Sequence, residues 1–150
     1  MMQSRRIDPL LRRAQEHEDE VARDLAERQR TLDTHVSRLE ELRSYAEEYA
    51  SSQMAATSPA QLSNRRAFLD RLDSAVQQQM RTVDQNRARV DAERARLLLA
   101  SREKQVLEQL AASYRTQERK VVERRDQREM DDLGARRARL ATAGEPGDAA

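Results

Sequence analysis

Two heptad repeats, one on each side of Pro59, constrain most strongly what this chain of 150 residues can fold into. Before the break, apolar residues recur in steps of three and four, in interleaved series that begin at Leu11 and Ala14. After the break, a second pair of series begins at Leu69 and Leu72, and weakens but continues through Val121. This spacing gathers apolar side chains into a stripe along a helix, which is buried only when it meets a second stripe. The pattern therefore predicts a coiled coil.

The composition agrees with long helices and disfavours a globular core. Hydrophobic and charged residues each make up 37% of the chain, and there is no Trp and one Phe, which is less apolar and aromatic material than a globular core uses. Gly and Pro number three each, and the long spans between them are rich in Ala, Leu, Glu, Gln and Arg, which are good helix formers. Because the heptads persist through these spans, we favour helices sharing a narrow seam over disorder.

Capping signals predict where the helices begin. Asp8-Pro9 predicts one start, since Asp can cap free amides and Pro is tolerated at the first helical position. Ser58-Pro59, with Gln61 at the capping-box spacing, predicts a second start. We therefore expect an all-α fold in which residues 1–143 form a single antiparallel coiled-coil hairpin. Its expected parts are a helix over about 8–52, a turn over about 53–60, a helix over about 61–140 and a disordered tail over 144–150.

The two stripes match when the second helix folds back onto the first. With Ala46 opposite Leu69, apolar residues face apolar residues and polar residues face polar ones. The pairs are Leu39 with Val76, Leu32 with Val83, Leu25 with Val90, Leu42 with Leu72, Ala14 with Ala100, His35 with Gln79, and Arg28 with Asn86. The polar layers lower stability but fix register. A slip of one heptad passes the same test, so the register stays open.

In this register the second helix runs past the start of the first near Lys104, and it continues unpaired for about 30 residues. The hairpin would be roughly 70 Å long and the second helix roughly 110 Å long. An amphipathic helix without a packing partner is marginal in water. We therefore expect this extension to fray or to pack on another protein; its apolar residues are Tyr114, Val121, Val122, Met130 and Leu133.

No catalytic, cofactor or metal site is expected. The chain has no Cys and two His, and it contains neither an H-E-x-x-H motif nor a glycine-rich phosphate loop. A narrow two-helix coil also offers no pocket from which water is excluded. We therefore expect that the protein is not an enzyme.

Charge and hydropathy disfavour nucleic acid and membrane as direct partners. The net charge is +1, and acidic residues are interleaved with the arginines between Arg115 and Arg139, which is typical of a solvated helix. Nucleic-acid binding remains an alternative, and it would weaken steeply with salt. The longest fully apolar run, Leu97 to Ala100, is too short to span a bilayer, and the first residues lack a signal-peptide core. We expect a soluble, intracellular protein.

Aromatic residues gather near the predicted turn. Of the four in the chain, Tyr45, Tyr49 and Phe68 flank it, and Tyr114 is the fourth. Tyr49 belongs to the seam, whereas Tyr45 and Phe68 lie off it. Exposed aromatic side chains on a charged surface are typical of a protein-binding hot spot. The other interpretation is a hydrophobic plug that closes the seam. We expect Tyr45 and Phe68 to be replaceable without loss of helicity if the first interpretation holds.

Two segments carry a family resemblance. Residues 39–49, with a Y-x-x-x-Y pattern, and residues 68–76, which begin F-L-x-x-L, resemble the FliJ family of bacterial flagellar export proteins. The resemblance implies a cytoplasmic part of the flagellar type III export apparatus, at the base of the flagellum on the inner face of the cell membrane. It implies a coiled coil similar to the central stalk of rotary ATPases, without cofactors. Its partners would be the hexameric export ATPase, the cytoplasmic part of the membrane export gate and export chaperones. We expect a monomer that associates with the membrane only through the gate.

The resemblance also implies two interfaces. The gate-contacting positions of the family correspond to Arg38, Leu42, Tyr45, Tyr49, Phe68, Leu72, Ala75 and Gln79, of which Arg38 and Gln79 depart in residue type. The end that carries both termini would enter the ATPase ring, which implies an interface of Leu10, Leu11, Ala14, Tyr114, Val121, Val122 and Met130.

Two other roles fit the same sequence. The equivalent stalk protein of a virulence type III secretion system shares the architecture. A generic scaffold that dimerises as a parallel coiled coil would instead be about twice as heavy and twice as long in solution.

Overall fold

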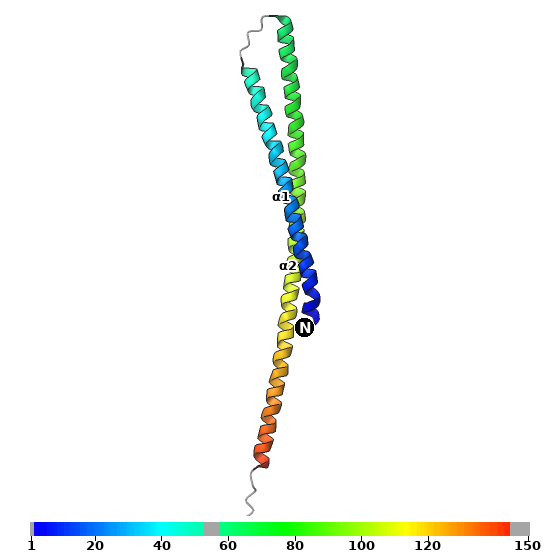
Figure 1. The fold of residues 1–150 in the computed structure, drawn as a ribbon, viewed down its shortest axis with the longest axis vertical. Coiled ribbons are helices and arrows are strands. Elements are labelled where there is room, and N and C mark those ends of the chain that lie inside the picture. Colours follow the sequence, from blue (N-terminus) through cyan, green and yellow to red (C-terminus); the bar gives the residue numbers. More distant parts are fainter. Residues whose placement is uncertain (1, 53–57, 145–150) are drawn as a thin grey trace, which may run out of the picture. The chain divides into compact units, whose positions relative to one another are not determined.

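The computed structural model describes residues 2–52 and 58–144, and the described part of the chain is helical (Figure 1). Helix α1 spans Met2–Ser51 and helix α2 spans Pro59–Ala143. The two helices pack against each other as a hairpin, which confirms the predicted all-α class. The chain forms two compact units: residues 14–103, here called the hairpin unit, and residues 1–13 with 104–150, here called the terminal unit.

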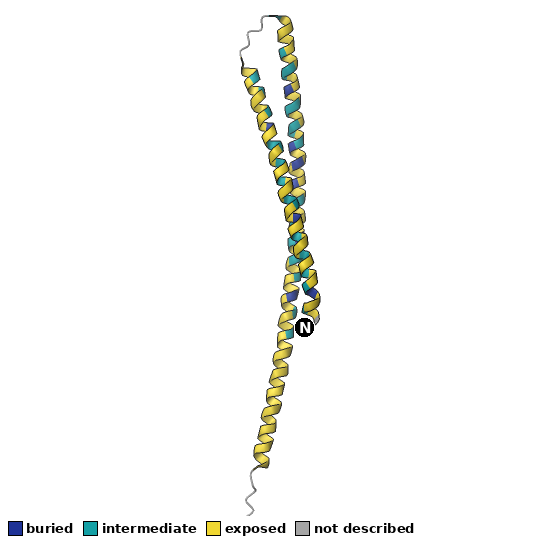
Figure 2. Ribbon diagram, in the orientation of Figure 1, coloured by how far each residue is buried: buried dark blue, intermediate teal, exposed yellow. Residues whose placement is uncertain are grey.

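The core of the hairpin unit is the predicted seam. Its buried apolar residues come from both helices and are Val21, Leu39, Leu72, Val83, Val90 and Ala100. Each occupies a position of the heptad series, so the stripes on the two sides of the turn face each other as expected. Figure 2 shows the same alternation, with buried and half-buried residues along one side of each helix.

A polar layer interrupts this core where the register predicts one. The side-chain amide nitrogen of Gln79 donates to the carbonyl oxygen of His35 at 2.9 Å and lies 3.3 Å from His35 Nδ1. One amide group has two hydrogens, so it satisfies both acceptors when His35 Nδ1 carries no proton. The contact confirms that His35 and Gln79 lie together.

The second predicted polar layer differs from expectation. Asn86 is buried, but its amide donates to the carbonyl oxygen of Thr82 at 2.8 Å, within its own helix. Arg28, the expected partner, is exposed. A long arginine side chain can keep its charged head in water while its stem covers the seam, so burial of the guanidinium is not required at this position.

Replacing both members of the polar layer with leucine should stabilise the hairpin. Apolar pairs at such positions avoid the cost of desolvating polar groups, so we expect His35→Leu with Gln79→Leu to raise the free energy of unfolding by roughly 1–3 kcal/mol. The same variant should fix the register less well. Thermal unfolding followed by circular dichroism measures the first effect, and spin-label distances across the seam measure the second. An unchanged or lower melting temperature would contradict the prediction.

Helix α1 begins earlier than the capping signal predicted. Asp8-Pro9 was expected to start the helix, but α1 begins at Met2 and Pro9 lies inside it. The additional residues are held by tertiary contacts in the terminal unit. Ile7 is buried, and the backbone nitrogen and hydroxyl of Ser4 donate to the two carboxylate oxygens of Glu118 at 3.2 and 2.7 Å. Such packing outweighs the hydrogen bond that proline removes from the helix.

The same contacts move the end of the paired region. Glu118 lies against Ser4, and Arg115 forms a 3.0 Å ion pair with Asp8, so α2 is covered well beyond Lys104, where the sequence predicted that pairing ends. Tyr114 is half-buried as a result. Val121, which was assigned to the weakening seam, is exposed. From residue 119 to residue 144, every residue is exposed (Figure 2).

The start of α2 follows the predicted cap. The backbone amide of Gln61 donates to the Ser58 hydroxyl at 3.3 Å, and Pro59 is the first helical residue. The predicted turn over 53–60 and tail over 144–150 fall mostly outside the described residues. Over 2–52 and 58–144, neither helix has a segment long and apolar enough to cross a membrane.

Candidate protein-interaction site

Three aromatic rings meet beside the turn of the hairpin unit. Tyr45 and Tyr49 come from α1 and Phe68 comes from α2, and together they are called the aromatic cluster here. The ring of Phe68 lies 4.5 Å from that of Tyr49, tilted by 59°, and 6.5 Å from that of Tyr45, at 80°. The second arrangement is edge-to-face, which is favourable for aromatic pairs. The fold-back of α2 therefore brings together the residues that the sequence placed on either side of the turn.

Burial divides the cluster into a packed part and an open part. Tyr49 and Phe68 are half-buried, whereas Tyr45 is 51% exposed. Phe68 thus packs against the tyrosine rings at the end of the seam, whereas half of the Tyr45 surface is open to solvent, so both interpretations of these aromatics stay predictions. The expectation that Phe68 can be replaced without loss of stability no longer follows, because its ring supports both tyrosines.

A shallow hollow lies next to Tyr45. It is lined by Arg38, Glu41, Leu42, Tyr45 and Gln79. Four of these are among the residues that the family resemblance implied, and the structure brings them to one surface. Glu41 was not among them, because its sequence signal is that of an ordinary charge on a helix. The lining of the hollow combines the apolar Leu42 with the opposite charges of Arg38 and Glu41, which suits a protein surface with both apolar and charged groups.

The other two residues implied at this end lie deeper. Leu72 is buried and belongs to the core of the hairpin unit, and Ala75 is half-buried. A change at Leu72 would therefore act first on folding, since large-to-small changes in a core leave a cavity.

Arg65 of α2 holds the end of α1. Its Nη2 donates to the carbonyl oxygens of Ser52 at 2.8 Å, Ala50 at 3.2 Å and Tyr49 at 3.4 Å. The last carbonyl groups of a helix lack backbone donors within it and carry partial negative charge. A guanidinium there both donates hydrogen bonds to these groups and is attracted by their charge. This interaction is called the Arg65 clamp here. Sequence analysis missed it, since an arginine on a charged helix gives no signal of such a contact.

The residues implied for the other interface lie mostly in the terminal unit. Tyr114 and Leu11 are half-buried, and the other four implied residues of this unit are exposed, namely Leu10, Val121, Val122 and Met130. Ala14 belongs to the hairpin unit, where it is half-buried.

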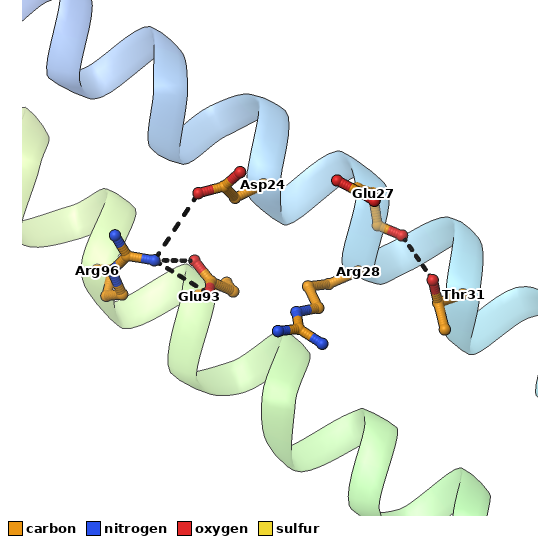
Figure 3. Close-up of a pocket in the computed structure, with 6 residues that line it drawn as sticks. All are labelled: Asp24, Glu27, Arg28, Thr31, Glu93 and Arg96. Atoms are coloured by element: carbon orange, nitrogen blue, oxygen red, sulfur yellow. Dashed lines mark hydrogen bonds and ion pairs between the residues drawn. The ribbon is translucent and has the colours of Figure 1, made fainter.

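A second hollow in the hairpin unit is lined by polar and charged side chains, some of which pair with one another. It is lined by Asp24, Glu27, Arg28, Thr31, Glu93 and Arg96 (Figure 3). Arg96 Nη1 lies 2.8 Å from Glu93 on its own helix and 3.9 Å from Asp24 on α1, and the Thr31 hydroxyl bonds the Glu27 carbonyl oxygen. Among residues 2–52 and 58–144, no group of His, Cys, Asp and Glu could hold a metal ion. The hollow is a layer of charges that joins the two helices.

Comparison with known proteins identifies the family. No curated protein and no solved structure matches the chain. The model of one family, described as "Flagellar FliJ protein", matches residues 2–142, which is most of the chain. The chain therefore belongs to the FliJ family, a non-enzymatic component of the flagellar export apparatus.

Proposed function

We propose that this protein is the stalk-like component that links the hexameric export ATPase to the cytoplasmic part of the membrane export gate. The aromatic cluster and the adjacent hollow bind the gate, and the exposed residues of the terminal unit bind the ATPase. The protein also binds export chaperones. It acts in the cytoplasm at the base of the flagellum, on the inner face of the cell membrane, and it meets the membrane only through the gate.

One observation supports the proposed gate-binding surface. Tyr45 exposes half of its surface beside a hollow that is lined by residues from both helices. A rigid aromatic side chain next to apolar and charged groups is the composition of an interface hot spot. The edge-to-face contact with Phe68 restricts the Tyr45 ring, which reduces the conformational entropy lost when a partner covers it.

Replacing Tyr45 tests this interface. We expect Tyr45→Ala to weaken binding to the isolated cytoplasmic part of the gate by about 30-fold, the effect of losing a hot-spot side chain, with little change in melting temperature. Calorimetry or surface plasmon resonance with purified partners measures the affinity. Binding to the export ATPase should stay within about twofold of the wild type. Full gate binding by this variant would overturn the assignment.

A matched variant in the terminal unit completes the experiment. Met130→Glu places a charge on an exposed position of α2, so it should leave folding intact and weaken ATPase binding while gate binding is retained. Loss of both interactions in either variant would indicate a general defect. The crossed pattern, one partner lost by each variant, is the result that supports two separate interfaces.

A further inference from the structure

The exposed part of α2 carries a second apolar stripe, distinct from the seam. Its apolar members are Val122, Met130, Leu133 and Leu140, which are between 41% and 73% exposed. Asp126 and Arg137 lie among them on the same face. At about 100° per residue, the six positions fall within an arc of roughly 80°. This set of six is called the C-terminal stripe here.

The C-terminal stripe is complementary to a reversed copy of itself. When the helix is turned end over end about the point between Asp131 and Asp132, Met130 falls opposite Leu133 and Val122 falls one residue from Leu140. The same operation places Asp126 opposite Arg137 and Arg137 opposite Asp126. Apolar residues thus meet apolar residues, and the pairing of Asp126 with Arg137 occurs twice in the dimer.

Neither charge is engaged by another of the residues that the structure describes. Of the described residues that form hydrogen bonds or ion pairs in this part of α2, Gln127 bonds Asp131 and Arg125 pairs with Glu129, whereas Asp126 and Arg137 do neither. Both remain available for contacts between chains. A parallel arrangement of two copies would set Asp126 against Asp126 and Arg137 against Arg137, which is unfavourable.

We propose that the C-terminal stripe is a self-association surface, on which a second copy of this chain binds antiparallel through the same six residues. A twofold axis makes such an interface isologous, so each residue appears in it twice. The surface is narrow, and interfaces of this size are transient. The dimer therefore forms at high protein concentration and dissociates on dilution, and the dilute chain is the monomer expected from the sequence. The proposal is argued from the residues of α2 alone; two of them, Val122 and Met130, also belong to the proposed ATPase interface.

Introduced cysteines test the orientation directly, because the chain has none of its own. Val122→Cys protein and Leu140→Cys protein, mixed under mild oxidation, should form a disulfide between chains. Each protein oxidised by itself should give several-fold less, because antiparallel pairing holds two Val122 positions about 27 Å apart. Equal or greater yields from the separate proteins would indicate parallel or random contact and would overturn the proposal.

A charge swap tests the residues that set the pairing. In analytical ultracentrifugation of the full chain, the mean mass should rise above 17.3 kDa with concentration. Asp126→Arg and Arg137→Asp should each weaken self-association by about tenfold, and the double variant should restore it, since both layers again join opposite charges. Arg128→Asp, an exposed charge away from the stripe, is the control and should have little effect. A mass that stays monomeric at every concentration, or a double variant as weak as the singles, would overturn the proposal.

Discussion

A single charge placed at Val83 should strongly destabilise the hairpin unit. Val83 is 2% exposed and faces the seam of α1, so the carboxylate of a Val83→Asp variant would be buried without a partner. We expect the free energy of unfolding to fall by more than about 3 kcal/mol. The melting temperature should fall by about 10 °C or more, measured by circular dichroism at 222 nm.

The chain offers a matched control for this change. Val106 is on the same helix and is 62% exposed, so Val106→Asp introduces the same side chain where water can solvate it. Its melting temperature should stay close to that of the wild type, because surface changes usually alter stability by less than about 0.5 kcal/mol. Similar losses in the two variants would show that helix propensity, and not burial in the seam, governs stability.

Removal of the Arg65 clamp should release the end of α1. Arg65→Ala leaves the carbonyl groups of Tyr49, Ala50 and Ser52 without this donor, and we expect a loss of about 1–2 kcal/mol. Hydrogen exchange should speed up first at the amide of Ser52, which bonds the Glu48 carbonyl oxygen at 2.9 Å. Arg65→Lys should recover part of the stability, because an ammonium keeps the charge but lacks the guanidinium geometry.

The neighbouring arginine provides the comparison. Arg66 is exposed, and Arg66→Ala removes the same charge from α2 without touching the end of α1. If Arg65→Ala and Arg66→Ala melt at the same temperature, the clamp makes no contribution of its own. If Arg65→Ala also weakens gate binding, the reason would be displacement of Tyr49, whose carbonyl group the clamp holds and whose ring supports Phe68.

The hairpin could be predicted from sequence because its core is built from residues that recur at a regular spacing along each helix. Leu39, Val83 and Val90 recur at heptad spacing, and that spacing alone decides which side of each helix is buried. The Ser58-Pro59 cap is equally local, since its hydrogen bond spans three residues. The start of α1 could not be predicted in this way. Its residues are held by Glu118 and Arg115, which are more than a hundred positions away, and the local signal at Asp8-Pro9 competes with those contacts and loses.

The candidate site, too, was predictable only in part. The fold-back predicted that Tyr45 and Phe68 would lie at one end, and their rings are indeed in contact distance of each other. The sequence could not reveal that Phe68 packs against two tyrosines, that Glu41 borders the hollow or that Arg65 caps the opposite helix. These features depend on where long side chains point once the helices are paired, and periodicity does not determine that.

The antiparallel return of α2 also sets an order of assembly. Arg65 and Tyr49 are 16 positions apart, Gln79 and His35 are 44 apart, and Glu118 and Ser4 are 114 apart. Bringing the last pair together first would cost about 1.7 kcal/mol more in loop-closure entropy than bringing the first pair together. Contacts between the helices are therefore expected to form first beside the turn and then successively toward the termini. During translation, Ile7 leaves the ribosome well before the residues around Glu118 have been made, and it is covered only after them.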